Sequence, residues 1–199
     1  MFNKMFSRLT AFMLMAIFLS CKKDPQTIPV VPLPAMEYFD LHDREINDHT
    51  TGLLLDVNHD GRNDLAFATL LVGDPINQVD KLQFLISSNI GINLPVNSNE
   101  EVPVMNNGTN IPLGNFDGYR WFELSSVTLV QKIISLTQPP VWQGHWRNAI
   151  HKFLPFQVAD SGKLFNGWVE ISSDIAGEQM ILHKAAISKE ANAMIKAGK

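Results

Sequence analysis

Apolar residues recur at every second position in short runs along the chain, and glycine, proline, asparagine and aspartate separate these runs. A period of two places alternate side chains on opposite faces of a strand, and the separating residues favour turns. The runs lie at residues 37–41, 52–55, 65–72, 82–87, 119–124, 128–135, 153–158, 167–172 and 180–186. Short strands at this spacing are typical of sandwiches. The pattern predicts an all-β protein, a single antiparallel β-sandwich of jelly-roll-like type.

Two segments have no clear strand pattern. Residues 88–118 contain three prolines and several glycines in turn contexts, so we expect long loops over one end of the sandwich. The tail after Ile187 fits either a short helix capped by Ser188 and running through Ile195, or an irregular segment.

The N-terminal part is patterned differently from the rest. The first 20 residues carry Lys4 and Arg8 and then an uncharged apolar run over 9–19, as secretory signals do. That run is too short to cross a bilayer core of about 30 Å. Residues 22–35 hold four prolines and predict an extended tether. We therefore predict a signal peptide at 1–20, a lipidated cysteine and linker at 21–35, and the sandwich domain at 36–199.

Cys21 is the only cysteine, so it has no disulfide partner within the chain. Phe18-Leu19-Ser20-Cys21 resembles the lipobox of bacterial lipoproteins, and this resemblance implies cleavage before Cys21 and a diacylglycerol on its sulfur. Lys22-Lys23-Asp24 is similar to the start of Bacteroidetes-type lipoproteins. The two resemblances imply outer-membrane attachment through the lipid, on the periplasmic face or the cell surface. An ordinary signal peptide is the alternative.

Oxygen-bearing side chains recur between two of the predicted strands, around Gly61, where the chain must turn sharply. Ca²⁺ takes about six to eight oxygen ligands, and alternate residues of a curling backbone supply them from one side. The predicted ligands are Asp56, Asn58, Asp60, Asp64 and the backbone carbonyl of Arg62. The sequence therefore predicts a calcium site.

The flanks of this segment exclude an EF-hand, because they have strand patterns and Phe67 occupies the position of its last glutamate. The segment resembles the DxNxDGxxD calcium loops that lie between strands of extracellular proteins. A metal-free tight turn is the alternative. If Ca²⁺ binds, we expect a structural role, since it activates bound water far less than Zn²⁺ does.

Four residues after Pro139-Pro140 form a candidate ligand site: Trp142, His145, Trp146 and Arg147. Two aromatic rings, an imidazole and a guanidinium can stack on and hydrogen-bond a sugar ring. The alternative is that the tryptophans fill one end of the sandwich. Trp168 follows Gly167 in a strand pattern and is predicted to lie in the core.

Other chemistry has less support. The six histidines form no HxH or HExxH pair, which disfavours zinc, and no GxSxG elbow marks a hydrolase triad. The acidic cluster of Asp40, Asp43, Glu45 and Asp48 fits a solvated strand edge. The net charge of −4 disfavours nucleic acid as a partner.

Five short motifs spread over residues 37–198 support a wider resemblance. They are Tyr38-Phe39-Asp40-Leu41, the segment 56–64, Leu154-Pro155-Phe156, Asn166-Gly167-Trp168-Val169-Glu170 and Ile195-Lys196-Ala197-Gly198. Together they resemble a loose group of secreted or lipid-anchored bacterial β-sandwich proteins. The resemblance implies the fold and an envelope location and transfers no activity.

We therefore expect a non-catalytic cell-envelope lipoprotein, a calcium-stabilised binding or structural module. Its expected partners are the membrane, through the lipid, and a glycan or an envelope protein. The alternative is a carbohydrate-active enzyme or a glycan-binding accessory protein on the same fold. An enzyme would draw two carboxylates from among Glu100, Glu101, Asp117 and Glu123.

Overall fold

The computed structural model describes residues 32–50 and 52–199, and Leu33–Lys199 form one compact unit. The predicted signal peptide, Cys21 and most of the predicted linker lie outside the described residues. Every regular element in the described ranges is a strand, and no helix there has the length and apolar character needed to cross a membrane.

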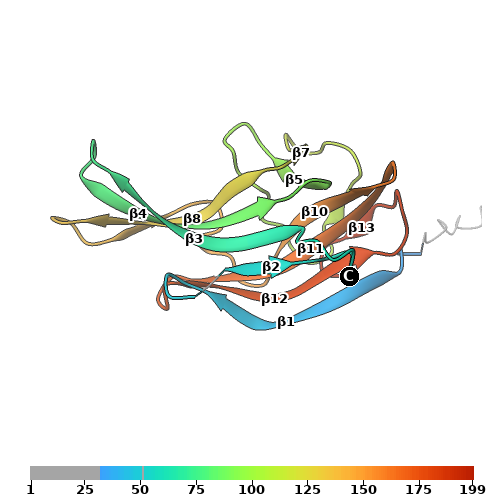
Figure 1. The fold of residues 1–199 in the computed structure, drawn as a ribbon, viewed down its shortest axis with the longest axis horizontal. Coiled ribbons are helices and arrows are strands. Elements are labelled where there is room, and N and C mark those ends of the chain that lie inside the picture. Colours follow the sequence, from blue (N-terminus) through green and yellow to red (C-terminus); the bar gives the residue numbers. More distant parts are fainter. Residues whose placement is uncertain (1–31, 51) are drawn as a thin grey trace, which may run out of the picture. The chain divides into compact units, whose positions relative to one another are not determined.

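Two antiparallel sheets face each other in this unit as an open sandwich (Figure 1). Sheet A has the order β1 (Met36–Ile46), β12 (Gln179–Ser188), β11 (Lys163–Asp174), β10 (Lys152–Asp160), β5 (Ile92–Val96) and β7 (Arg120–Glu123). Sheet B has the order β2 (Leu53–Leu55), β3 (Leu65–Asp74), β4 (Val79–Ser88), β8 (Ser126–Ser135) and β9 (Val141–Gln143). β6 (Asn110–Ile111) and β13 (Ile195–Lys196) form a separate pair. The prediction of an antiparallel β-sandwich is confirmed.

The core lies between the two sheets because the period of two points one set of side chains inward. Leu82, Phe84 and Ile86 on β4 are buried, whereas the residues between them are partly exposed. They join Val169 of β11 and Leu182 of β12 in one apolar cluster. Burying each such side chain stabilises the fold by about 1.5–3 kcal/mol.

Sheet A is also covered on part of its other face. Trp168 and Phe153 lie edge to face there, with ring centroids 5.1 Å apart. β6 and β13 cover them through Ile111 and Ile195, which belong to the same buried cluster. Trp168 is 2% exposed, so its predicted core position is confirmed, although its cluster forms a second, outer layer.

The prediction that residues 88–118 form long loops is wrong for residues 92–96, and the short strand β6 (Asn110–Ile111) also lies within this segment. Residues 92–96 form β5, which pairs with β10 and β7, and Ile92 and Leu94 are fully buried. β5 pairs with β10 only at Ile92 and Asn93. Pro95 lies outside this paired stretch, so its lack of a backbone N–H breaks no hydrogen bond to β10.

The tail after Ile187 forms no helix. Ser188 Oγ accepts the N–H of Glu190 at 3.1 Å, and the chain then turns toward β13, where Ile195 pairs with Ile111. The short strand β13 places the end of the chain over the outer face of sheet A.

Candidate functional site

The loop of residues 56–64, called the 56–64 loop below, joins β2 to β3. Its side chains accept hydrogen bonds from its own backbone. The Asp56 carboxylate accepts the N–H groups of Asp60 at 3.2 Å and Gly61 at 2.9 Å. Asn58 Oδ1 also accepts the Asp60 N–H at 3.0 Å, and Asp60 Oδ1 accepts the Arg62 N–H at 2.8 Å. Gly61 has a left-handed φ of 84°, which glycine adopts without strain. The backbone therefore curls around the Asp56 carboxylate.

Asp64, the last residue of the loop, differs from the others because its side chain is buried. It is 4% exposed, and its Oδ2 accepts the Val57 N–H at 2.8 Å. Burial raises the pKa of the Asp64 carboxyl, and the nearby negative charges of Asp60 and Asp56 raise it further, against the lowering effect of the Val57 N–H. The loop thus holds three acidic groups close enough to repel one another.

No three histidine, cysteine, aspartate or glutamate side chains are arranged as a metal site within residues 32–50 and 52–199. In the 56–64 loop the side-chain oxygens face backbone N–H groups, as they do in a metal-free turn. The chemistry of the donors nevertheless fits Ca²⁺, because hard oxygens surround a short curl and their carboxylates repel without a cation. Calcium binding by the loop stays a prediction.

A cleft of about 570 Å³ opens beside this loop at one end of the sandwich. Its loop wall includes four of the predicted calcium ligands, Asn58, Asp60, Arg62 and Asp64. Its apolar lining comes from strands of sheet A and includes Ile92, Val158, Phe165 and Ile187. Its remaining lining includes Asn63, Asn89, Ile90, Asp160 and Lys189. A concave apolar surface with a few polar groups is the usual form of a ligand site, and we call it the loop cleft.

The structure does not assemble the predicted aromatic site. Trp146 is 1% exposed, and its indole N–H donates to the Val102 carbonyl at 3.3 Å in the core. Trp142 lies on β9 and packs against Phe84, with ring centroids 5.8 Å apart. Because only His145 and Arg147 of the four are exposed, the alternative prediction, in which the tryptophans fill the sandwich, describes their positions.

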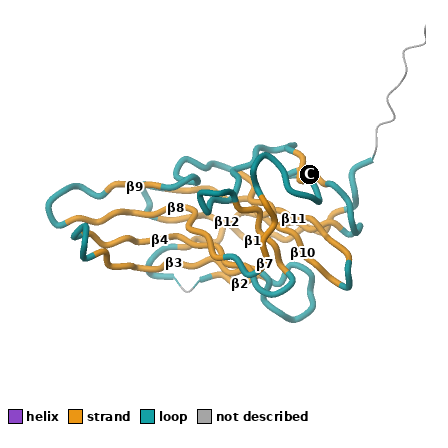
Figure 2. Tube along the Cα trace, turned by 90° about the horizontal axis from the view of Figure 1, so that it is seen from above, coloured by secondary structure: helices purple, strands orange, loops and turns teal. Residues whose placement is uncertain are grey.

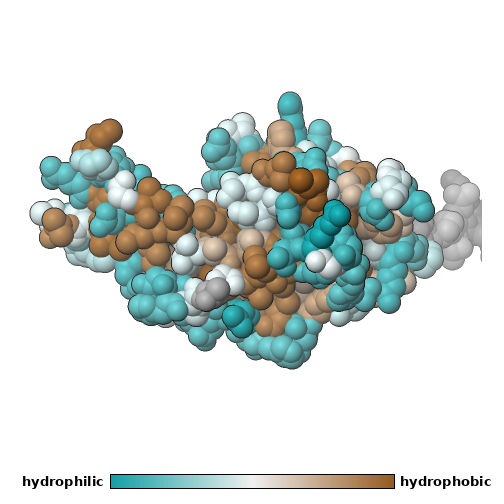
Figure 3. Space-filling model, viewed as in Figure 1, coloured by the Kyte–Doolittle hydropathy of each residue, from teal (hydrophilic) through white to brown (hydrophobic). Residues whose placement is uncertain are grey.

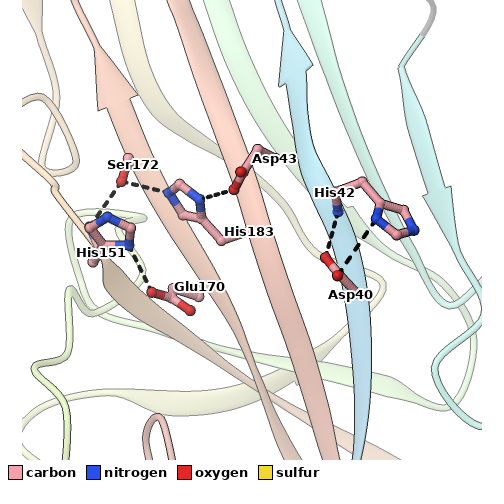
Figure 4. Close-up of polar contacts among 7 residues, drawn as sticks. All are labelled: Asp40, His42, Asp43, His151, Glu170, Ser172 and His183. Atoms are coloured by element: carbon pink, nitrogen blue, oxygen red, sulfur yellow. Dashed lines mark hydrogen bonds and ion pairs between the residues drawn. The ribbon is translucent and has the colours of Figure 1, made fainter.

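A second polar cluster lies on sheet A where its strands are irregular (Figure 4). His183 is an extra residue in β12 relative to β11, and β1 bulges at the same level over residues 41–43. Asp43 has a left-handed φ of 50°, as does its neighbour His42 at 55°. These bulges direct Asp43 toward His183, and β11 contributes Glu170 and Ser172 beside them.

Hydrogen bonds connect five of these residues into what we call the histidine network: Asp43, His183, Ser172, His151 and Glu170. A carboxylate only accepts, so His183 donates through Nδ1 to Asp43 at 2.5 Å, and its Nε2 lies 2.8 Å from the Ser172 hydroxyl oxygen in a second hydrogen bond. Ser172 Oγ also accepts the His151 backbone N–H at 2.9 Å. His151 Nδ1 donates to Glu170 at 2.8 Å, and the two imidazoles stack with centroids 4.3 Å apart.

Aspartate, histidine and serine are hydrogen-bonded in the same order as in a hydrolase triad. Here, however, the serine is buried and the aspartate is exposed, the opposite of what a triad needs. Ser172 is 8% exposed and its Oγ is engaged by two groups, whereas the Asp43 side chain is 77% exposed. A nucleophile must reach its substrate, so Ser172 does not fit that role. The network instead connects the bulges of β1 and β12 to the neighbouring strand β11.

The four carboxylates considered for an enzyme do not gather at the loop cleft. None of them lines it. Glu101 accepts the Asn97 side-chain N–H at 3.1 Å, and Glu123 accepts the Gly91 backbone N–H at 2.5 Å. The neighbouring Glu101 and Asp117 act with burial, which is the larger cause, to raise the pKa of Tyr119. Glu101 and Glu123 therefore have local structural partners.

Comparison with known proteins leaves the chain without a family assignment. No protein-family model, curated protein or solved structure matches it at a significant level.

Proposed function

We propose that the protein is a non-catalytic, lipid-anchored module of the bacterial outer membrane that binds a ligand in the loop cleft, with a Ca²⁺ ion in the 56–64 loop. The observation that carries this proposal is the position of the cleft. Four of the five predicted calcium ligands lie in one of its walls. An ion that fixes the loop would therefore also fix the shape of the ligand site.

The lining of the cleft favours a neutral ligand rich in hydroxyl groups, such as a glycan. Asn63 offers a side-chain amide with both a donor and an acceptor, whereas the amides of Asn58 and Asn89 are already hydrogen-bonded within the protein. Ile90 is 75% exposed beside them and offers an apolar contact for the C–H face of a sugar ring. Acidic and basic side chains both line the cleft, which gives no preference for a strongly charged ligand.

The histidine network supports the non-catalytic part of the proposal. Its exposed ring, His151, is held by Glu170, and its serine is buried. General acid–base chemistry needs a group within hydrogen-bond reach of a bound substrate, and the network residues do not line the loop cleft.

We expect the substitution Ile90→Asp to weaken glycan binding at least about tenfold, a loss of about 1.4 kcal/mol, because it places a charge on the apolar edge of the cleft. Binding is measured with a glycan array and then by calorimetry on the strongest ligand. Ile150→Asp is the matched control, since Ile150 is 68% exposed and lies outside the cleft. Equal binding by both variants, or no glycan bound by the unchanged protein, would remove the glycan site. Turnover of any glycan in parallel hydrolysis assays would contradict the non-catalytic assignment.

The lipid anchor has its own test. Cys21→Ala is expected to abolish incorporation of a palmitate analogue and to release the protein from the membrane fraction, because it removes the only thiol in the sequence. Several acyl chains hold a protein firmly at a bilayer, whereas an unlipidated tether does not. Ser20→Ala, which keeps the cysteine, should remain labelled. A Cys21→Ala protein that is still labelled and membrane-bound would refute the anchor.

A further inference from the structure

Sheet B extends beyond sheet A as an arm, at the left of Figures 1 and 2. We define the arm as residues 70–83 of β3 and β4 together with residues 131–143 of β8 and β9. Apolar side chains gather over it in Figure 3. Its exposed large apolar residues are Leu70, Leu71, Val72, Ile76, Leu136 and Val141.

One side of β3 has no partner strand along the arm. β2 pairs with β3 only as far as Phe67, and the Thr69 hydroxyl then reaches the Asn47 carbonyl at 3.3 Å. Within the described ranges, residues 70–74 pair with β4 alone. The N–H and C=O groups of these residues that point away from β4 therefore form an open sheet edge, along the lower margin of the arm in Figure 2.

The sequence of β3 is that of a strand covered on both faces. Residues 65–73 carry no charge, and near the arm Leu71 lies on one face and Leu70 and Val72 on the other. Leu71 is 63% exposed, Leu70 49% and Val72 37%. Edge strands are usually protected by charges, prolines or bulges, and residues 68–73 have none of these. A sequence suited to the middle of a sheet therefore occupies its edge.

We propose that residues 70–74 of β3 pair antiparallel with the same residues of a second copy of the chain, which joins the two arms into one continuous sheet. Val72 then lies opposite Val72 of the other copy. Leu71 lies opposite Gly73 of the other copy, and the missing side chain of glycine leaves room for the leucine.

The charges of the edge favour a second copy as the occupant. The uncharged strand brings no like charges together when it meets itself. Asp74, the one charged residue among residues 70–74, is already paired with Lys81 of its own copy at 2.8 Å. An acidic or basic partner segment would find no complementary charge on this edge.

The direction of β3 also suits self-pairing. The strand runs from the sandwich toward the tip of the arm (Figure 1). Antiparallel pairing of the two arm segments therefore places the two sandwiches at opposite ends of the joined arms, where they do not collide.

Sedimentation velocity of the chain from Lys22 onward, which contains the whole compact unit, tests the proposal. The unchanged protein should shift from monomer to dimer as its concentration rises through the micromolar range. Leu71→Lys should weaken the dimer more than about tenfold, because it brings positively charged lysines of both copies together between the paired β3 strands. Leu124→Lys is the matched control, since Leu124 is 62% exposed and lies before β8, at the end of that strand away from the arm. It should leave dimerisation unchanged.

A cysteine substitution locates the joint directly. The chain from Lys22 onward has no cysteine, so Val72→Cys introduces a single thiol at the proposed two-fold axis. Opposed residues in antiparallel strands lie about 4.5–5.5 Å apart, within the range that a disulfide spans. Val72→Cys should form a disulfide-linked dimer on oxidation, and Leu124→Cys should not. The proposal would be overturned by a protein that stays monomeric, by a dimer that Leu71→Lys leaves intact, or by equal cross-linking at both positions. The first of these results would mean that the edge of β3 does not bind a second copy of the chain.

Discussion

Replacing Trp146 with alanine is expected to lower the free energy of unfolding by about 3–5 kcal/mol, the usual loss for a buried large aromatic side chain. The indole is 1% exposed, within the apolar cluster between the sheets. Its removal leaves a cavity and deprives the buried Val102 carbonyl of the indole N–H. At about 2–4 °C per kcal/mol for a domain of this size, the melting temperature should fall by roughly 10 °C.

Urea denaturation measures this loss, and the neighbours of Trp146 supply the controls. His145 and Arg147 are exposed, so His145→Ala and Arg147→Ala should each change the free energy of unfolding by less than about 0.5 kcal/mol. If Trp146→Ala kept its stability and lost ligand binding instead, the aromatic ligand site predicted from the sequence would be reinstated.

The period of two in the sequence was enough to predict most of the strands and the sandwich, because one buried face imposes alternation on each strand. The same rule could not decide between the two roles of Trp142 and Trp146. Both residues follow a proline pair in a segment with turn composition, and only the position of β9 beside β8 shows that the segment returns to the sheet. β5 was missed for a related reason, since Pro95 makes a five-residue strand resemble a loop.

The histidine network had no sequence signal. Asp43 and His183 are 140 residues apart, and they meet only because β1 and β12 are neighbours that bulge at the same level. The sequence did identify Asp43 as part of a solvated acidic edge, which agrees with its exposure of 77%. Its hydrogen bond to His183 depends on the register of two strands, which residue spacing does not encode.

Calcium is expected to raise the melting temperature of the metal-stripped protein. An ion that binds only the folded state stabilises it by mass action, by about 2.7 kcal/mol at a hundredfold excess over the dissociation constant. That corresponds to a rise of roughly 5–10 °C. The physical reason lies in Asp64, whose burial beside Asp56 and Asp60 disfavours its charged form without a cation.

Two variants distinguish an ion bound in the 56–64 loop from an ion bound elsewhere in the loop cleft. Asp60→Ala should abolish the calcium response, because it removes a carboxylate from the middle of the 56–64 loop and one partner of Arg62. Asp160→Ala should keep the response, since Asp160 lines the same cleft from the end of β10 and lies outside the loop. Loss of the response in both variants would place the ion elsewhere in the cleft.

Differential scanning calorimetry of the metal-stripped chain from Lys22 onward, with and without added Ca²⁺, tests the calcium-stabilised module most directly. Mg²⁺ at the same concentration controls for the general effect of a divalent cation. The proposal predicts a rise in melting temperature with Ca²⁺ that is absent in Asp60→Ala and retained in Asp160→Ala. An unchanged melting temperature with saturating Ca²⁺ would contradict the proposal and would mean that the 56–64 loop is a metal-free, hydrogen-bonded turn.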